Sequence, residues 1–281
     1  NPKKEKRFFT LNLTKILFFA GLVLCLPLYG FLCMTNLDAV TGFFSESSLP
    51  VVLFYAAVFL IPVLMILFST ALQKKLSFSI SNSKVLSVLS FCIGGVMLLG
   101  SVLHTVELVA VIRQILAMSE ISMLPPGMLL GTVQIPMAIL SGIVFIRLEI
   151  GYLKESIANR NTFTFLFPLI WALINCIEMF QQYPQIAGMP ERTLYLLCLL
   201  SFTLFLMGQT RLLNDIDFSK GTRWVSAFGL CAALFGLTMT VGEIVAFSSM
   251  TLPLFDVLFT FILSLYCIAF SSNVRAVKSA A

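Results

Sequence analysis

Long runs of apolar residues, separated by short polar segments, dominate the chain. The run from Val51 to Leu72 contains no charged residue across 22 positions. About 20 apolar residues in a helix cross the hydrocarbon core of a bilayer, and in lipid each backbone N–H and C=O group needs a hydrogen-bond partner within the protein. A closed barrel would instead need short segments of alternating polarity. The pattern therefore predicts an all-α integral membrane protein with a single polytopic domain over residues 1–281.

Eight runs are long enough to form transmembrane helices. They cover Leu13–Met34, Val51–Leu72, Val85–Thr105, Gly127–Ile146, Phe163–Tyr183, Leu194–Leu213, Trp224–Ala246 and Pro253–Ser272. We expect the third helix to continue beyond the membrane towards Met118. A basic segment precedes the first run, as in a signal peptide, but that run is longer than a typical signal core and has no Ala-x-Ala-like site at its end. We expect it to remain as a transmembrane helix.

The composition agrees with a membrane protein. Hydrophobic residues make up 59% of the chain and charged residues only 11%, whereas soluble domains carry roughly 25% charged residues. The seven cysteines all lie in or at the edge of apolar runs, and none forms a CxxC pair. This spacing favours packing roles over a zinc site or a disulfide framework.

The charged residues predict the orientation. With the N-terminus inside, 16 of the 18 basic residues fall on the inner side, and only Arg113 and Arg192 fall in outer segments. Short cytoplasmic loops are rich in Lys and Arg. Eight crossings return the chain to its starting side, so we predict a cell-membrane protein with both termini cytoplasmic. Eight of the 13 acidic residues lie on the outer side or in the outer half, which is either a solvated rim or a mouth that attracts cations.

The helices show an internal repeat of four tandem hairpins. Each even-numbered helix begins near a proline and reaches a basic residue 21 to 24 positions later, although both features are partly generic for inward helices. Each odd-numbered helix ends at an acid, and Asp38, Glu107, Glu178 and Glu243 follow one another at intervals of 69, 71 and 65 residues. We predict parallel repeats, related by rotation about the membrane normal, over residues 12–75, 84–154, 161–215 and 222–278.

Polar residues at membrane depth indicate a candidate site, because such residues tend to face the bundle interior or a watery cavity. In the fifth helix, Asn175, Glu178 and Gln182 are spaced i, i+3 and i+7 and share one face. We expect Glu178 to be central, since an unpaired carboxylate at its depth is costly. Similar residues lie in the outer halves of the third, fourth and seventh helices. The complete predicted set is Glu178, Asn175, Gln182, His104, Glu107, Gln134 and Glu243.

A simpler interpretation exists for most of this set. Glu107 and Glu243 lie close enough to the outer interface to form a solvated rim. The amides of Asn and Gln side chains, and the imidazole of His104, commonly join helices by hydrogen bonds. Glu178 fits this interpretation least.

No sequence motif names a reaction. There is no HExxH, GxSxG, P-loop or GxGxxG motif, and one histidine cannot supply two axial ligands to haem. We therefore expect a protein that is not an enzyme, with no cofactor and no nucleic-acid partner. The favoured function is to bind or translocate a small solute, including a cationic and proton-coupled one, through an outward-facing, acid-lined site.

Two alternatives remain at this stage. The chain could be a non-catalytic anchor or assembly subunit of a larger membrane complex, with partner subunits on its basic cytoplasmic face. That face could equally bind anionic lipid of the bilayer. The second alternative is an intramembrane enzyme that acts on a lipid and uses His104 and Glu107 as acid–base partners.

Overall fold

The structure is a computed structural model that describes residues 2–38, 42–44, 48–70, 77–78, 83–117, 128–154, 162–186, 189–214, 216–246 and 252–275. Its long helices are α1 (Pro2–Thr35), α2 (Leu49–Thr70), α3 (Lys84–Ala117), α4 (Met128–Lys154), α5 (Leu166–Ile186), α6 (Pro190–Leu213), α7 (Phe218–Val245) and α8 (Leu254–Asn273). A single 3-10 turn, η1 (Thr162–Phe165), precedes α5. Within the described part of the chain, eight helices are long and apolar enough to cross a membrane. The predicted multi-pass helical fold is confirmed.

Several helices are longer than their apolar cores. α3 continues to Ala117, as the sequence predicts. α7 begins at Phe218 rather than Trp224, because the side chain of Asp217 caps it and accepts a hydrogen bond of 3.2 Å from the backbone N–H of Lys220. This bond, together with the charge of Lys220, holds the pKa of Asp217 below its ordinary value. Aspartate is a favoured N-cap residue, so the sequence contains this start signal.

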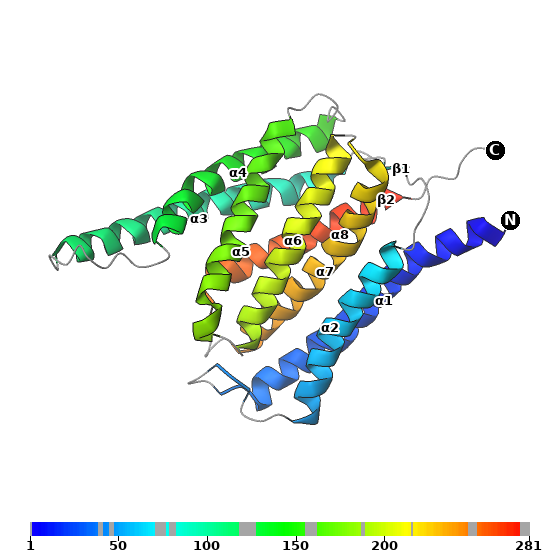
Figure 1. Ribbon diagram of the computed structural model, residues 1–281, viewed down its shortest axis with the longest axis horizontal. Coiled ribbons are helices and arrows are strands. Elements are labelled where there is room, and N and C mark those ends of the chain that lie inside the picture. The colour runs from blue at the N-terminus through cyan, green and yellow to red at the C-terminus, as the bar shows by residue number, and fades with distance from the viewer. Residues whose placement is uncertain are drawn as a thin grey trace.

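Six of the helices form a closed ring. In the described residues, α3 packs against α4, α4 against α5, α5 against α6, α6 against α7, α7 against α8, and α8 returns to α3. Consecutive helices are therefore neighbours, and the contact between α3 and α8 completes the circle. Figure 1 shows α5, α6 and α7 running close to parallel, with α3 and α4 inclined across them.

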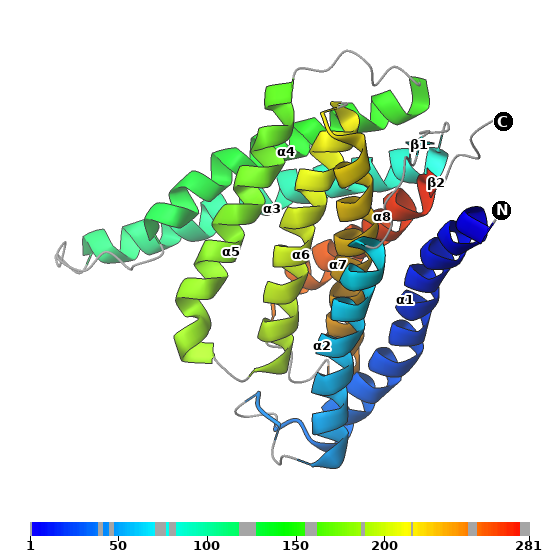
Figure 2. The same cartoon turned by 45° about the vertical axis from the view of Figure 1, so that its right-hand side comes forward.

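The hairpin formed by α1 and α2 lies outside this ring and packs against α7. In Figure 2 the two helices stand to one side of the molecule, opposite the far ends of α3 and α4. α7 thus contacts the hairpin on one side and its ring neighbours on the other. This position explains why α7 is the most buried of the eight spans.

Glycines bring two helix pairs into close contact. Gly94 on α3 faces Gly142 on α4, where an added Cβ at Gly94 would lie 2.7 Å from the Gly142 carbonyl oxygen. Gly208 on α6 faces Gly221 on α7, where an added Cβ at either glycine would lie 3.1 Å from the carbonyl oxygen of the other. Small residues at helix crossings allow the close backbone approach that drives packing in membranes.

The helices alternate in direction, so the molecule has two distinct ends. We call one the pocket end, where α1, α3, α5 and α7 finish and the other four helices begin. At the opposite, basic end, strand β1 (Ser77–Phe78) pairs with β2 (Val274–Arg275), which brings the connection after α2 beside the end of α8. The basic end also carries Arg147, Arg211, Lys220 and Arg223. Figure 1 shows the start of α1 and the end of α8 on the same side of the molecule.

The predicted hairpins exist as contacting pairs, α1 with α2, α3 with α4, α5 with α6, and α7 with α8. Only three of them belong to the ring, so the first hairpin has a different environment from the others. Rotational equivalence of the four units stays a prediction.

Candidate functional site

A cavity of about 340 Å³ lies inside the ring at its pocket end. Residues of α3, α4, α5, α6 and α8 line it, so it occupies the space that these helices enclose. Five of the seven predicted site residues are among the lining residues, namely His104, Glu107, Gln134, Asn175 and Glu178. Helix faces that are separate in the sequence therefore converge on one cavity.

The cavity is built from helical stripes. On α5, Trp171, Asn175 and Glu178 are spaced i, i+4 and i+7, so all three project from one face of the helix into the cavity. On α3, Ser101 and His104 line the cavity at i and i+3. This periodicity fixes which residues share the cavity.

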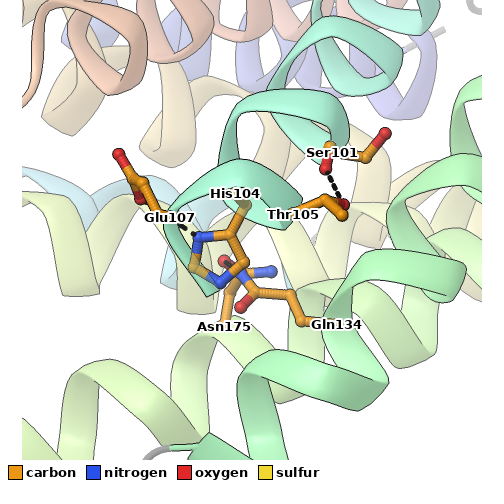
Figure 3. A network of polar contacts seen from close by, with 6 residues as sticks. All are labelled: Ser101, His104, Thr105, Glu107, Gln134 and Asn175. Atoms are coloured by element: carbon orange, nitrogen blue, oxygen red, sulfur yellow. Dashed lines mark hydrogen bonds and ion pairs between the residues drawn. The ribbon is translucent and has the colours of Figure 1, made fainter. Parts of the chain in front are cut away.

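Two amide side chains join α4 to α5 inside the cavity. Nε2 of Gln134 donates a hydrogen bond of 2.7 Å to Oδ1 of Asn175, and Nδ2 of Asn175 donates one of 2.8 Å to the carbonyl oxygen of Trp171. Figure 3 shows the side chains of His104, Gln134 and Asn175 gathered between α3, α4 and α5. Oε1 of Gln134 is buried and accepts no hydrogen bond. A buried acceptor without a donor is costly, so a ligand that donates a hydrogen bond would stabilise this arrangement.

His104 and Glu107 form an ion pair at the cavity mouth, where Nδ1 of His104 lies 3.7 Å from Oε2 of Glu107 (Figure 3). The Glu107 side chain is 76% exposed and that of His104 is 39% exposed. Glu107 therefore has the rim position that the simpler interpretation gave it. His104 also approaches α4, where an added Cβ at Gly131 would lie 3.3 Å from Nε2.

Three lining residues with titratable side chains were not among the predicted set: Arg192, Tyr195 and Asp256. Arg192 and Tyr195 lie in the first turns of α6, which starts at Pro190. Asp256 lies in the first turn of α8 and interacts electrostatically with Arg192, His104, Glu107 and Glu178. Proline at the first position of a helix signals such a start, so the sequence pattern was sufficient to place Arg192 inside a helix.

The other two predicted residues are Gln182 and Glu243. The side chain of Gln182 lies outside the described residues. Glu243 is only 4% exposed but does not line the cavity. It lies instead near Tyr29 and Cys33 of α1 and Glu191 of α6, which interact with one another electrostatically. The third carboxylate of the cavity is thus Asp256, and Glu243 lies on the side of α7 that faces the α1–α2 hairpin.

Glu178 is half-buried, and its carboxyl interacts electrostatically with the side chain of His104. Its position on the cavity side of α5 agrees with the prediction that it faces the bundle interior. Among the described residues, no group of three or more His, Cys, Asp and Glu side chains could hold a metal ion.

Over the residues that the structure describes, eight long apolar helices fit a multi-pass membrane protein, and six of them form a ring with a charged cavity at one end. No protein-family model, curated protein or solved structure matches the chain significantly.

Proposed function

We propose that this protein binds and translocates a small cationic solute through the cavity at its pocket end, which faces the outside of the cell. The cavity itself is the observation that carries this proposal. It lies inside the helical ring, opens at a mouth marked by Glu107, and is lined by charged groups from four different helices.

The charges favour a cationic solute. Glu107, Glu178 and Asp256 supply three carboxylates, against the guanidinium of Arg192 and the imidazole of His104. Electrostatic attraction is stronger in a partly dry cavity than in bulk water, because the low-dielectric walls focus the electric field. A carboxylate at this depth can also exchange a proton for a cation, which gives Glu178 a role in coupling.

We infer that a buried polar cluster closes the opposite end of the ring, which an alternating-access transporter requires when its cavity is open to the outside. Tyr152 of α4, Gln209 of α6 and Tyr266 of α8 meet there, with a hydroxyl–hydroxyl distance of 2.9 Å and with Nε2 of Gln209 donating to both hydroxyls. All three are at most 2% exposed. α4, α6 and α8 are alternate members of the ring, so their side chains meet only across its interior. Access to the cavity from one side with closure on the other is the arrangement of an alternating-access transporter.

Cysteine modification tests this proposal without a known solute. Ser101 lines the cavity and is 5% exposed. In a Cys92→Ser background we expect Ser101→Cys to react in intact cells with the impermeant cationic reagent MTSET, several-fold faster than with anionic MTSES. In inside-out vesicles it should react more slowly but measurably. Intact-protein mass spectrometry counts the adducts.

The matched control is Ser226→Cys on α7, which is 4% exposed and does not line the cavity; it should stay unmodified from both sides. Reaction of Ser101→Cys from the outer side alone would refute translocation and leave a binding protein. Absence of reaction from both sides would refute the open cavity and favour the anchor or assembly subunit. Glu178→Gln should slow the MTSET reaction without slowing MTSES, and an unchanged ratio would contradict the electrostatic role of Glu178.

The proposed orientation places the basic end in the cytoplasm, with both termini. It rests on the charge asymmetry between the ends, which follows the positive-inside rule. Topology reporters fused after Arg7 and after Lys278 should both give cytoplasmic signals, and a reporter near Glu46 should give an external one. A reversed signal at any of these positions would overturn the orientation.

A further inference from the structure

The cavity changes character with depth. Along α5, Trp171 lies seven residues before Glu178, which places it about 10 Å further from the mouth at 1.5 Å per residue. Along α3, Met97 precedes Glu107 by ten residues, or about 15 Å. The carboxylates therefore lie towards the mouth, and the deep part of the cavity is apolar.

The deep part is also aromatic. The rings of Trp171 and Phe259 pack edge to face with their centroids 5.4 Å apart, and both residues line the cavity. Phe255 lines the cavity nearer the mouth, from the first turn of α8, and lies so close to Gly100 of α3 that any side chain at Gly100 would collide with its ring. Aromatic surfaces at this depth are suited to a flat apolar group, and they also attract cations within about 6 Å of a ring.

The polar part has hydrogen-bond acceptors suited to an ammonium group. Gln134 bonds Asn175, which lies one turn from Glu178 on α5. Oε1 of Gln134 is a buried acceptor without a donor, and the Glu178 carboxyl adds acceptors one turn away. An ammonium group has three N–H donors and a positive charge, so it could satisfy both residues at once. Arg192 acts on Asp256, which leaves Glu178 as the main carboxylate for this head group.

We propose that the solute is an organic cation that joins a primary ammonium head to a flat aromatic tail, with the head between Glu178 and Gln134 and the tail against Trp171 and Phe259. This inference rests on the proposed function and specifies its substrate class. The cavity volume of about 340 Å³ is near the lower limit of the roughly 300–1,000 Å³ found for small-molecule sites, which restricts the tail to one or two rings.

A ligand series on the full-length protein in detergent, measured by isothermal titration calorimetry against empty micelles, tests the proposal. The probe is phenethylammonium. Three relatives each change one property: 3-phenylpropionate reverses the charge, ethylammonium removes the ring, and 2-cyclohexylethylammonium replaces the aromatic ring by a saturated one. We expect phenethylammonium to bind at least about tenfold more tightly than the first two, since each loses a charge-assisted or aromatic contact, and several-fold more tightly than the third.

Variants of the protein test which residue binds the ammonium head and which residue binds the aromatic tail. Glu178→Gln should weaken phenethylammonium binding at least about tenfold, and its control Glu149→Gln, at the basic end of α4, should not. Trp171→Leu keeps an apolar side chain and should abolish the preference for phenethylammonium over its cyclohexyl relative. Trp224→Leu is the control, because Trp224 packs against Arg211, 4.8 Å from its ring centroid, at the basic end.

Equal binding of 3-phenylpropionate, equal binding of ethylammonium, or an unchanged affinity in Glu178→Gln would each overturn the proposal. If Trp171→Leu does not fold, the ligand series on the wild-type protein still tests the proposed substrate class. The proposed function is tested separately, because reaction of Ser101→Cys from both sides requires no amine. A chain that passes that test but binds none of the ammonium probes is a transporter of another solute.

Discussion

Gly94→Ala is expected to lower the thermal stability of the protein strongly, whereas Gly95→Ala is expected to leave it unchanged or raise it. A Cβ at Gly94 would lie 2.7 Å from both the Gly142 carbonyl oxygen and Cγ1 of Ile146, and backbone cannot yield as a flexible side chain can. Overpacking of this kind typically costs about 1–3 kcal/mol. A Cβ at Gly95 meets nothing within 4 Å, and alanine favours a helix over glycine by up to about 1 kcal/mol.

The two variants differ by one position in the same helix, so each controls for the other. Thermal unfolding in detergent, followed by circular dichroism or by binding of a thiol-reactive dye to the buried cysteines, measures the difference. α3 and α4 both line the cavity, so Gly94→Ala should also alter the MTSET reaction of Ser101→Cys. Similar melting temperatures for the two variants would show that α3 and α4 do not cross at Gly94.

Gln209→Leu is expected to loosen the closed end of the ring. Gln209 is 2% exposed and donates to the hydroxyls of Tyr152 and Tyr266, which are themselves fully buried. Leucine keeps most of the volume but removes the donor for both hydroxyls. Loss of a partner by buried polar groups costs about 1–3 kcal/mol, so both stability and closure should suffer. Gln114→Leu, at an exposed position of α3, is the matched control.

Cysteine reaction rates measure closure of the basic end separately from stability. In inside-out vesicles, Ser101→Cys should react with MTSET faster when it is combined with Gln209→Leu than when it is alone. The outer-side rate should fall or stay the same, since opening one end of an alternating-access protein depopulates the other state. A lower melting temperature with unchanged reaction rates on both sides would show that the cluster of Tyr152, Gln209 and Tyr266 stabilises helix packing but does not close the transport path.

The sequence predicts the helices well because a bilayer leaves the backbone few choices. In the described part of the chain, eight apolar runs become eight helices, and the residues spaced i, i+3 on α3 and on α5, His104 with Glu107 and Asn175 with Glu178, line one cavity. The periodicity of one helix does not determine which other helix it meets. Glu243 lies in the outer half of its helix, as Glu107 and Glu178 do, yet α7 turns Glu243 towards α1.

The missed residues have a different cause. Arg192 lies in the first turn of α6, just before the predicted helix Leu194–Leu213, because hydropathy alone assigns charged residues at helix starts to loops. Asp256 lies inside the predicted helix Pro253–Ser272, in the first turn of α8, but hydropathy does not show which other helices its side chain meets. Hydropathy also could not predict that α7 is buried among other helices, because hydropathy measures affinity for lipid and not burial against protein. Its small residues, including Gly221, Gly229, Gly236 and Gly242, are each close to a side chain or carbonyl of a neighbouring element. A count of small residues along each span would have identified α7 as the helix with most protein contacts.

The contact between α3 and α8 has a consequence for the biogenesis of the protein. It joins segments more than 150 residues apart in the chain, such as Gly100 and Phe255, and it closes the ring. During synthesis, hairpins that are adjacent in sequence can associate as they leave the translocon, but this last contact requires α8 to have entered the membrane. Before that moment α3 presents Ser101 and His104 to lipid or to a chaperone. Assembly of the cavity is therefore a post-insertion event, and chains arrested before α8 expose polar residues that membrane quality control can recognise.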